Sequence, residues 1–281
     1  MTPRSHFIRV QSTDLHYLEW GSPANPSLVL LHGGAAHAHW WDHIAPRLAR
    51  YYRVLAFDLR GHGYSGWIVP PAYEVEDYVA DLEEVIATLN LAPLILLGHS
   101  LGGFVALTYA SAHPAALRAL VVVDIGARLG GSRFMRLLRS VPSPVYQDEA
   151  DLLRRFRLLP VETHVTPALI QYIARSSVLS QVDGGLRLKC DRATLTRESR
   201  DLNARLGQIT CPTLFLRGRD SLNLSAETLS KLVALCPQAQ GVDIAGAGHH
   251  VFLDQPASFM DVIHGFLGEV VRQKLNAGIS P

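Results

Sequence analysis

The sequence predicts an α/β fold, in which a mostly parallel, doubly wound sheet carries helices on both faces and an inserted helical segment. Apolar runs of strand length alternate with segments of helical period, the alternation stops over residues 127–209, and it then resumes. A Gly-His-Ser-Leu-Gly turn, residues 98–102, joins one apolar run to a long apolar segment. We therefore expect an α/β core of residues 1–126 and 210–281, with a helical lid, here called the cap, over residues 127–209.

The elements before the turn follow from their apolar patterns. Residues 9–20 alternate loosely between polar and apolar and predict a hairpin. Residues 27–32 and 53–58 are mainly apolar, as strands covered on both faces are. Helical spacing predicts helices over residues 40–50 and 76–90. In the second of these helices the apolar positions are Val79, Leu82, Val85, Ile86 and Leu89.

The elements after the turn repeat the alternation on either side of the cap. Prolines and a Gly-Gly pair punctuate the cap, which carries helix-like segments and no convincing core strand. An insertion at this point lies at the carboxyl ends of the strands, where ligands bind in such sheets. The predicted strands are 94–97, 119–123, 213–216 and 241–244, and the predicted helices are 104–112, 225–235 and 255–275.

Composition excludes several classes of protein. The chain has 281 residues, a net charge of +1 and no run near the roughly 20 apolar residues of a membrane helix. We therefore expect neither nucleic acid nor a membrane as partner, and a cytoplasmic location without a signal peptide. The three cysteines have no paired spacing, and no dinucleotide fingerprint is present, so we expect no disulfide framework, no metal and no cofactor. Oligomeric state leaves no signal in this sequence.

Ser100 is the candidate nucleophile. It stands in a Gly-x-Ser-x-Gly turn between a buried strand and a helix, the arrangement called a nucleophile elbow. The flanking glycines lack a Cβ, so strand and helix can close around the serine and hold it in a strained conformation. The positive end of the helix dipole then favours negative charge on a bound carbonyl oxygen.

His249 is the candidate base, because a serine is a poor nucleophile until a base accepts its proton. It follows the last predicted strand in the segment Ala245-Gly246-Ala247-Gly248-His249-His250. A histidine in a glycine-rich loop there can reach over the sheet edge to Ser100. Its neighbour His250 should point elsewhere.

Taken together, these motifs resemble those of the alpha/beta-hydrolase family over essentially the whole chain. The matching segments are His32-Gly33-Gly34, Asp58-Leu59-Arg60-Gly61-His62-Gly63-x-Ser65, Gly98-His99-Ser100-Leu101-Gly102-Gly103 and Gly246-Ala247-Gly248-His249. The resemblance implies an oxyanion hole formed by the N–H groups of Gly34 and Leu101. It also implies that the cap covers the pocket, and that His32, Asp58 and Arg60 brace the site.

The acid of the triad is where the sequence departs from the common family pattern. Members usually carry it three residues beyond a glycine, after the strand that follows the cap, and this position holds Ser221. Asp220 lies one residue early. Some members carry the acid after the strand before the cap, where this chain has Asp124. We favour Asp124 and keep Asp220 as the alternative, because both preserve the chain order of serine, acid and histidine.

The predicted function is a cofactor-independent serine hydrolase that cleaves a carboxylic ester or lactone of a small organic molecule. Ser100, Asp124 and His249 form its triad, and Gly34 and Leu101 its oxyanion hole. The alternatives are hydrolysis of a C–C or amide bond by the same triad, and a receptor-like binding protein with little turnover.

The charge of the cap leads to a hypothesis about the substrate. Residues 127–209 hold thirteen arginines and one lysine against eight acids, a net charge of +6 in a chain of +1. Arginine is suited to bidentate carboxylate binding, so the substrate would be anionic and bound by cap arginines. Arg154, Arg155, Arg157, Arg197 and Arg200 equally fit solvated helix faces paired with nearby acids. Trp40 and Trp41 fit either the pocket wall or the core.

Overall fold

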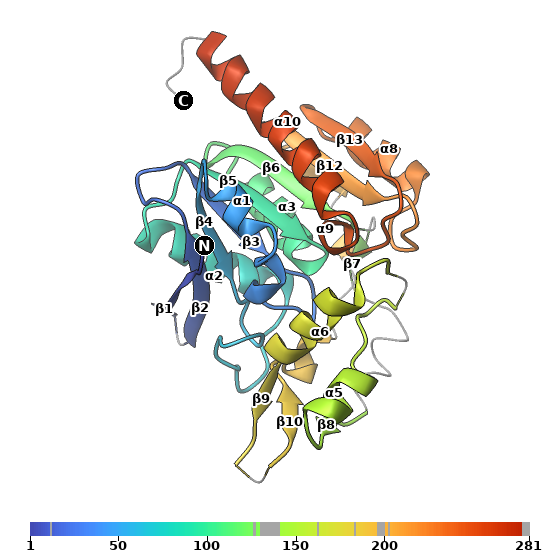
Figure 1. Ribbon diagram of the computed structural model, residues 1–281. Helices are drawn as coiled ribbons and strands as arrows, with labels where there is room; N and C mark the ends of the chain where they lie inside the picture. Colours follow the sequence, from blue (N-terminus) through green and yellow to red (C-terminus); the bar gives the residue numbers. More distant parts are fainter. Residues whose placement is uncertain are drawn as a thin grey trace.

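A computed structural model describes residues 1–276 except 12, 126–127, 130–140, 162, 183, 196–199 and 202. It confirms the predicted fold class: eight strands form one sheet, parallel from its centre to one edge, with helices on both faces (Figure 1). In sheet order the strands are β1 Arg4–Val10, β2 Thr13–Trp20, β4 Arg53–Phe57, β3 Ser27–Leu31, β5 Leu94–His99, β6 Leu117–Val123, β12 Thr213–Gly218 and β13 Ala239–Ile244.

The first two strands are the exception to the parallel arrangement. The strands β1 and β2 form the predicted hairpin, and β2 also pairs antiparallel with β4. The other strands pair parallel, so the carboxyl ends of β3, β5, β6 and β12 meet at one rim of the sheet. This rim places the segments after these strands side by side.

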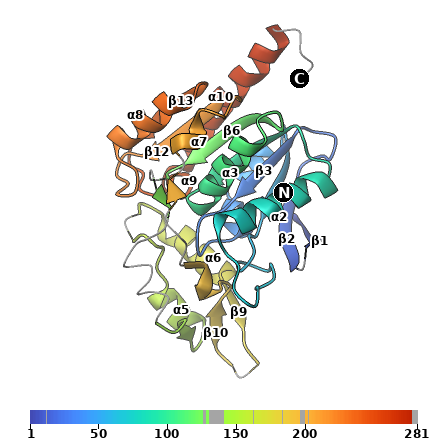
Figure 2. The same cartoon turned by 180° about the vertical axis from the view of Figure 1, so that it is seen from behind.

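Helices bury both faces of the sheet. One face packs against α2 Val75–Thr88, α3 Leu101–Ala112 and α8 Ala226–Leu235. The other face packs against α1 Ala45–Leu48, α9 Val251–Asp254 and the long helix α10 Pro256–Asn276 (Figures 1 and 2). Within the described residues, every helix is too short or too polar to cross a bilayer.

The single helix predicted over residues 40–50 is wrong, because the segment forms two short helices. A 3₁₀ helix, η1 Ala38–Trp41, is followed by a turn and then by α1. Pro46 explains the break: proline has no N–H to donate to the preceding turn, and it fits only in the first turn of a helix. After the break, α1 packs against the sheet.

The described part of the cap contains more strand than the sequence predicted. It holds the helices α5 Glu149–Arg155 and α6 Pro167–Ser176 and the 3₁₀ helix η2 Arg192–Leu195. A small antiparallel sheet in the order β8 Val145–Tyr146, β10 Leu186–Leu188, β9 Val178–Ser180 accompanies them. These strands are two or three residues long, too short to leave a period-2 pattern. In Figure 1 the cap lies below the core, at the carboxyl ends of the parallel strands.

The two ends of the cap meet in a short ladder between β7 Arg128–Leu129 and β11 Arg200–Asp201. The helix that follows, α7 Asn203–Leu206, returns to the core. Leu206 and Ile209 are fully buried in the cluster beneath α3 and α8, although the predicted cap extended to residue 209. These two residues therefore pack with the core rather than with the rest of the cap.

Side-chain hydrogen bonds attach the cap to the core on several sides. Asp254, at the end of α9, accepts from Thr163 Oγ1 and from the backbone N–H of His164. On another side Tyr73 Oη donates to Asp191 at 2.7 Å, and Tyr172 Oη donates to Asp42. The apolar core of the cap is continuous with the cluster around α1 and α10.

Candidate active site

Ser100 occupies the sharp turn between β5 and α3. Its backbone has φ 51° and ψ −116°, a conformation that a non-glycine residue adopts only under strain. A Cβ on Gly98 would lie 2.2 Å from the Gly102 carbonyl oxygen, and one on Gly102 would lie 2.4 Å from that of Leu31. Both glycines are therefore required for strand and helix to approach. Ser100 is partly exposed at the rim.

His249 reaches the same rim from the loop between β13 and α9. The ring of His99, which immediately precedes Ser100, bonds through Nε2 to the His249 carbonyl oxygen at 3.0 Å. The two rings lie 4.6 Å apart. This contact ties the loop of the candidate base to the residue before the candidate nucleophile. His99 was not among the site residues expected from the sequence, where only its place beside the elbow serine could have indicated a role.

Asp124 follows β6 and receives three hydrogen bonds. Its Oδ1 accepts from His249 Nδ1 at 2.8 Å and from Ser221 Oγ at 2.6 Å, and its Oδ2 accepts from the Gly218 N–H at 3.0 Å. The carboxyl is fully buried. Its backbone φ of 47° lies in the left-handed region. The arrangement leaves Nδ1 of His249 engaged and Nε2 available for chemistry.

Ser221 is a second residue of the site that was not expected from the sequence. It occupies the position at which the resemblance places the acid, and its hydroxyl instead supports the carboxylate of Asp124. In the sequence, the only indication of this role was that a serine stands where the family usually has the acid.

Asp220 lies apart from the candidate base. Its side chain is about half exposed and pairs with His164 Nε2 of the cap at 3.1 Å. It therefore joins cap to core, whereas Asp124 is the acid that the structure brings to His249.

The two predicted oxyanion donors come from neighbouring segments. Leu101 is the first residue of α3, so its N–H has no intrahelical acceptor. A Cβ on Gly34 would meet no atom within 4 Å, so open space adjoins that residue. His32 Nδ1 donates to the Gly33 carbonyl oxygen at 2.7 Å, and in a planar trans peptide the Gly34 N–H points the opposite way. The His32 carbonyl also accepts from the Gly102 N–H at 3.1 Å, which joins the segment to the elbow.

The carboxylate of Asp58 supports the segment that follows β3 and contains Gly34. Its carboxylate accepts from the Ala38 N–H at 2.6 Å, from His16 Nδ1 at 2.7 Å and from the Tyr64 N–H at 2.9 Å. Burial alone would raise the pKa of Asp58, but the His16 hydrogen bond and nearby histidines outweigh burial and lower it. Arg60, also predicted to brace the site, pairs with the buried Asp81. Both residues are structural supports in this geometry.

The two tryptophans that the sequence left between pocket wall and core are both buried. Trp41 is fully buried and stacks on Phe252 at 4.2 Å, so it belongs to the core. Trp40 is also buried, with its ring edge-on to His250.

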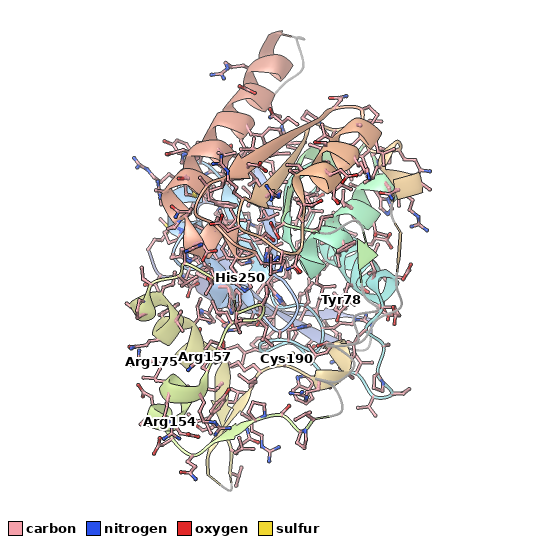
Figure 3. The ribbon with its side chains drawn as sticks, turned by 90° about the vertical axis from the view of Figure 1, so that its right-hand side faces the viewer. Tyr78, Arg154, Arg157, Arg175, Cys190 and His250 are labelled. Carbon is pink, nitrogen blue, oxygen red and sulfur yellow. The ribbon has the colours of Figure 1, made fainter. Side chains whose placement is uncertain are left out.

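Four of the described arginines of the cap are engaged locally. Arg154 and Arg155 pair with Asp151, and Arg157 donates to backbone carbonyls. Figure 3 shows Arg154, Arg157 and Arg175 within the cap, and Arg175 pairs with Glu149. Arg197 and the side chain of Arg200 lie outside the described residues.

Three histidine rings gather beside the candidate triad. His99, His249 and His250 each offer one nitrogen, and these nitrogens lie within 4.8 Å of one another. Burial lowers the pKa of His99 and of His250 well below the usual value, so both rings are neutral. The thiols of Cys190, Cys211 and Cys236 are buried, and no disulfide joins them in the part of the chain that the structure describes.

Comparison with known proteins gives a consistent result. Residues 26–256 match the family described as alpha/beta hydrolase fold. A 2-(acetamidomethylene)succinate hydrolase from Mesorhizobium japonicum is 30% identical over 93% of this chain and 96% of its own. An sn-1-specific diacylglycerol lipase from Mus musculus is 30% identical over 88% and 82%. The crystal structure of E-2-(acetamidomethylene)succinate hydrolase superposes with a TM-score of 0.84 at 27% identity, covering 95% and 99%.

Proposed function

Because the chain belongs to the alpha/beta-hydrolase family, we propose that it is a cofactor-independent serine hydrolase that cleaves a carboxylic ester or lactone through an acyl-enzyme. The observation that carries the proposal is the hydrogen bond between His249 Nδ1 and the buried Asp124, on the rim where the elbow presents Ser100. Without a base in a fixed tautomer, an elbow serine has no means of losing its proton.

In the proposed reaction, Ser100 Oγ attacks the carbonyl carbon while His249 Nε2 accepts the hydroxyl proton. Asp124 holds the histidine tautomer and stabilises the imidazolium that forms. The N–H groups of Gly34 and Leu101 donate to the oxyanion of the tetrahedral intermediate. His249 then protonates the leaving group, and water activated by the same histidine hydrolyses the acyl-enzyme.

Amide hydrolysis is the second candidate reaction. The name of the Mesorhizobium relative denotes a substrate with an acetamido group, which is an amide, whereas the mouse relative is a lipase. The same triad serves both, because the tetrahedral intermediate is alike and only the leaving group differs. An ester substrate makes the smaller demand on His249, since an alcohol leaves with less assistance than an amine.

We also propose that the substrate is anionic, with a more limited role for the cap arginines than direct binding. The same relative acts on a succinate, which carries two carboxylates. The cap carries a net positive charge, but Arg154, Arg155 and Arg175 already pair with cap carboxylates. The proposed role of the cap charge is therefore long-range steering of an anion toward the site rather than direct contact by these three side chains.

The test combines turnover with active-site labelling. Wild-type protein should hydrolyse a short p-nitrophenyl ester and be labelled at Ser100 by a fluorophosphonate. Ser100→Ala should lose on the order of 10⁴- to 10⁶-fold in rate and all labelling, with an unchanged melting temperature. Ser230→Ala, on the exposed face of α8, is the matched control and should behave as wild type. Wild-type protein that neither turns over nor is labelled would be a receptor-like binding relative.

A further inference from the structure

We propose that His99, His249 and His250 form a binding site for a transition-metal ion such as Zn²⁺, and that the bound ion reversibly switches hydrolysis off. The three residues come from two segments of the rim. His99 ends β5, and the other two precede α9. Figure 3 places His250 in the core close to the cap.

The three rings form a compact, buried group. Their centroids lie 4.6, 5.5 and 5.1 Å apart, and their exposed fractions are 1% for His99, 6% for His249 and 2% for His250. Neutral imidazole is a preferred ligand of zinc, copper and nickel, whereas magnesium and calcium prefer oxygen. Three histidines are also sufficient protein ligands for a zinc ion that keeps one open position.

The hydrogen bonds leave one suitable nitrogen on each ring. His249 Nδ1 is held by Asp124, so its Nε2 carries the lone pair. His99 donates from Nε2 to a carbonyl oxygen, so its lone pair is on Nδ1, a buried atom with no partner among the described residues. By hydrogen-bond geometry neither ring nitrogen of His250 has a partner among the described residues, although the Leu159 backbone is near enough to oppose the fall in the pKa of this ring.

Unpartnered nitrogens in a buried site are costly, because a donor or acceptor loses its hydration without gaining a bond. A metal ion would supply that bond to His99 and His250 together. The Asp124–His249 pair already has the form of a carboxylate–histidine–metal unit, in which the carboxylate orients the ligand ring. The cluster therefore already has an oriented ligand ring at His249 and neutral rings at His99 and His250.

The distances between the ring nitrogens indicate why the bound ion would be a reversible inhibitor. Nitrogens bound to one zinc ion at about 2.1 Å in a tetrahedron stand about 3.4 Å apart, less than the 4.8 Å within which one nitrogen of each of the three rings lies. Binding thus needs small ring rotations, so the site is not a rigid preformed cage. The ion takes the Nε2 lone pair of His249, which is the pair that accepts the Ser100 proton in the proposed reaction.

The experiment measures inhibition and binding separately, using tag-free protein. Zn²⁺ should abolish ester hydrolysis by the wild type, EDTA should restore it, and Mg²⁺ should have no effect. His250→Phe preserves a planar ring against Trp40 and leaves the triad intact, so it should retain basal turnover. Its inhibition should need at least about 10-fold more Zn²⁺, the smallest loss expected even for an outer partner of a metal ligand. His113→Gln changes a partly exposed histidine paired with Glu83 and should be inhibited as wild type is.

Binding is measured on Ser100→Ala, which keeps all three histidines and needs no activity. Calorimetry should give one Zn²⁺ per chain, Co²⁺ should give a visible spectrum typical of histidine ligands, and adding His250→Phe should remove both signals. Only the inhibition arm rests on the proposed function. Equal Zn²⁺ sensitivity of His250→Phe and wild type, or absence of Zn²⁺ binding to Ser100→Ala, would overturn the metal site even if hydrolysis is established.

Discussion

Lowering the pH from about 7 to about 5.5 should destabilise the protein through His37, a buried histidine that joins the segment after β3 to the cap. Its Nε2 lies 2.9 Å from Ser177 Oγ, and that hydroxyl donates to the Ile173 carbonyl. The hydroxyl therefore accepts from His37, which fixes a neutral Nε2–H tautomer. Burial lowers the pKa of His37 to about 3. Asp58 opposes this shift, and His39, Lys189 and His32 add to it.

The magnitude follows from proton linkage. An unfolded histidine titrates near pH 6.5, so below that pH the unfolded chain binds a proton that folded His37 does not bind until about pH 3. Stability must therefore fall as pH falls through this window. Between about pH 7 and 5.5 the loss from this one group is about 1.2 kcal/mol, and the limiting slope is about 1.4 kcal/mol per pH unit.

The assay compares the free energy of unfolding in urea of wild type and His37→Gln at the two pH values. Glutamine can still donate to Ser177 but does not titrate. Wild type should be the more stable at about pH 7, and its advantage should shrink by about 1.2 kcal/mol at about pH 5.5. An advantage that stays constant within about 0.3 kcal/mol would show that His37 titrates alike in both states, and the reasoning from burial would fail.

The remaining predictions concern the acid and the charge of the substrate. Asp124→Asn should lower kcat by about 10³- to 10⁴-fold, because asparagine can favour the wrong tautomer of His249, whereas Asp220→Asn should cost little because it breaks only an exposed pair with the cap. Steady-state kinetics of both variants in parallel would reassign the acid if the ranking were reversed. A carboxylate-bearing ester should have a higher kcat/KM than its neutral amide analogue at low salt, and added salt should narrow the difference, since charges are screened over about 10 Å at 0.1 M. Preference for the neutral analogue at low salt would remove the anionic-substrate hypothesis.

Local sequence patterns were sufficient for the sheet and the elbow. Alternating apolar strands and amphipathic helices define the parallel layers, and Gly98 and Gly102 allow the close approach that the turn around Ser100 requires. Each of these features depends on residues within one turn or one strand of each other, so it can be read along the chain. The helix break at Pro46 also has a local cause, but it was not predicted.

The cap was harder to predict because its elements are short. Strands of two or three residues bury too few side chains to leave a periodic signal. The sequence of α7 resembles the rest of the insertion, and only the structure places Leu206 in the core cluster that contains α3. The net charge of the cap also did not show which arginines are free to bind a substrate. The net charge of the cap was available from composition, but only the fold pairs Arg175 with Glu149.

The sequence by itself determined which residues end the parallel strands, and hence that Ser100, both candidate acids and His249 gather at one rim. Only the tertiary structure decided that Asp124, and not Asp220, meets His249. The strands β6 and β12 are neighbours, so both aspartates follow adjacent strand ends. The hydrogen bonds that distinguish them join Asp124 to Ser221 and to His249 across 97 and 125 positions. Contacts at such separations exist only when the whole sheet is assembled, and no local pattern encodes them.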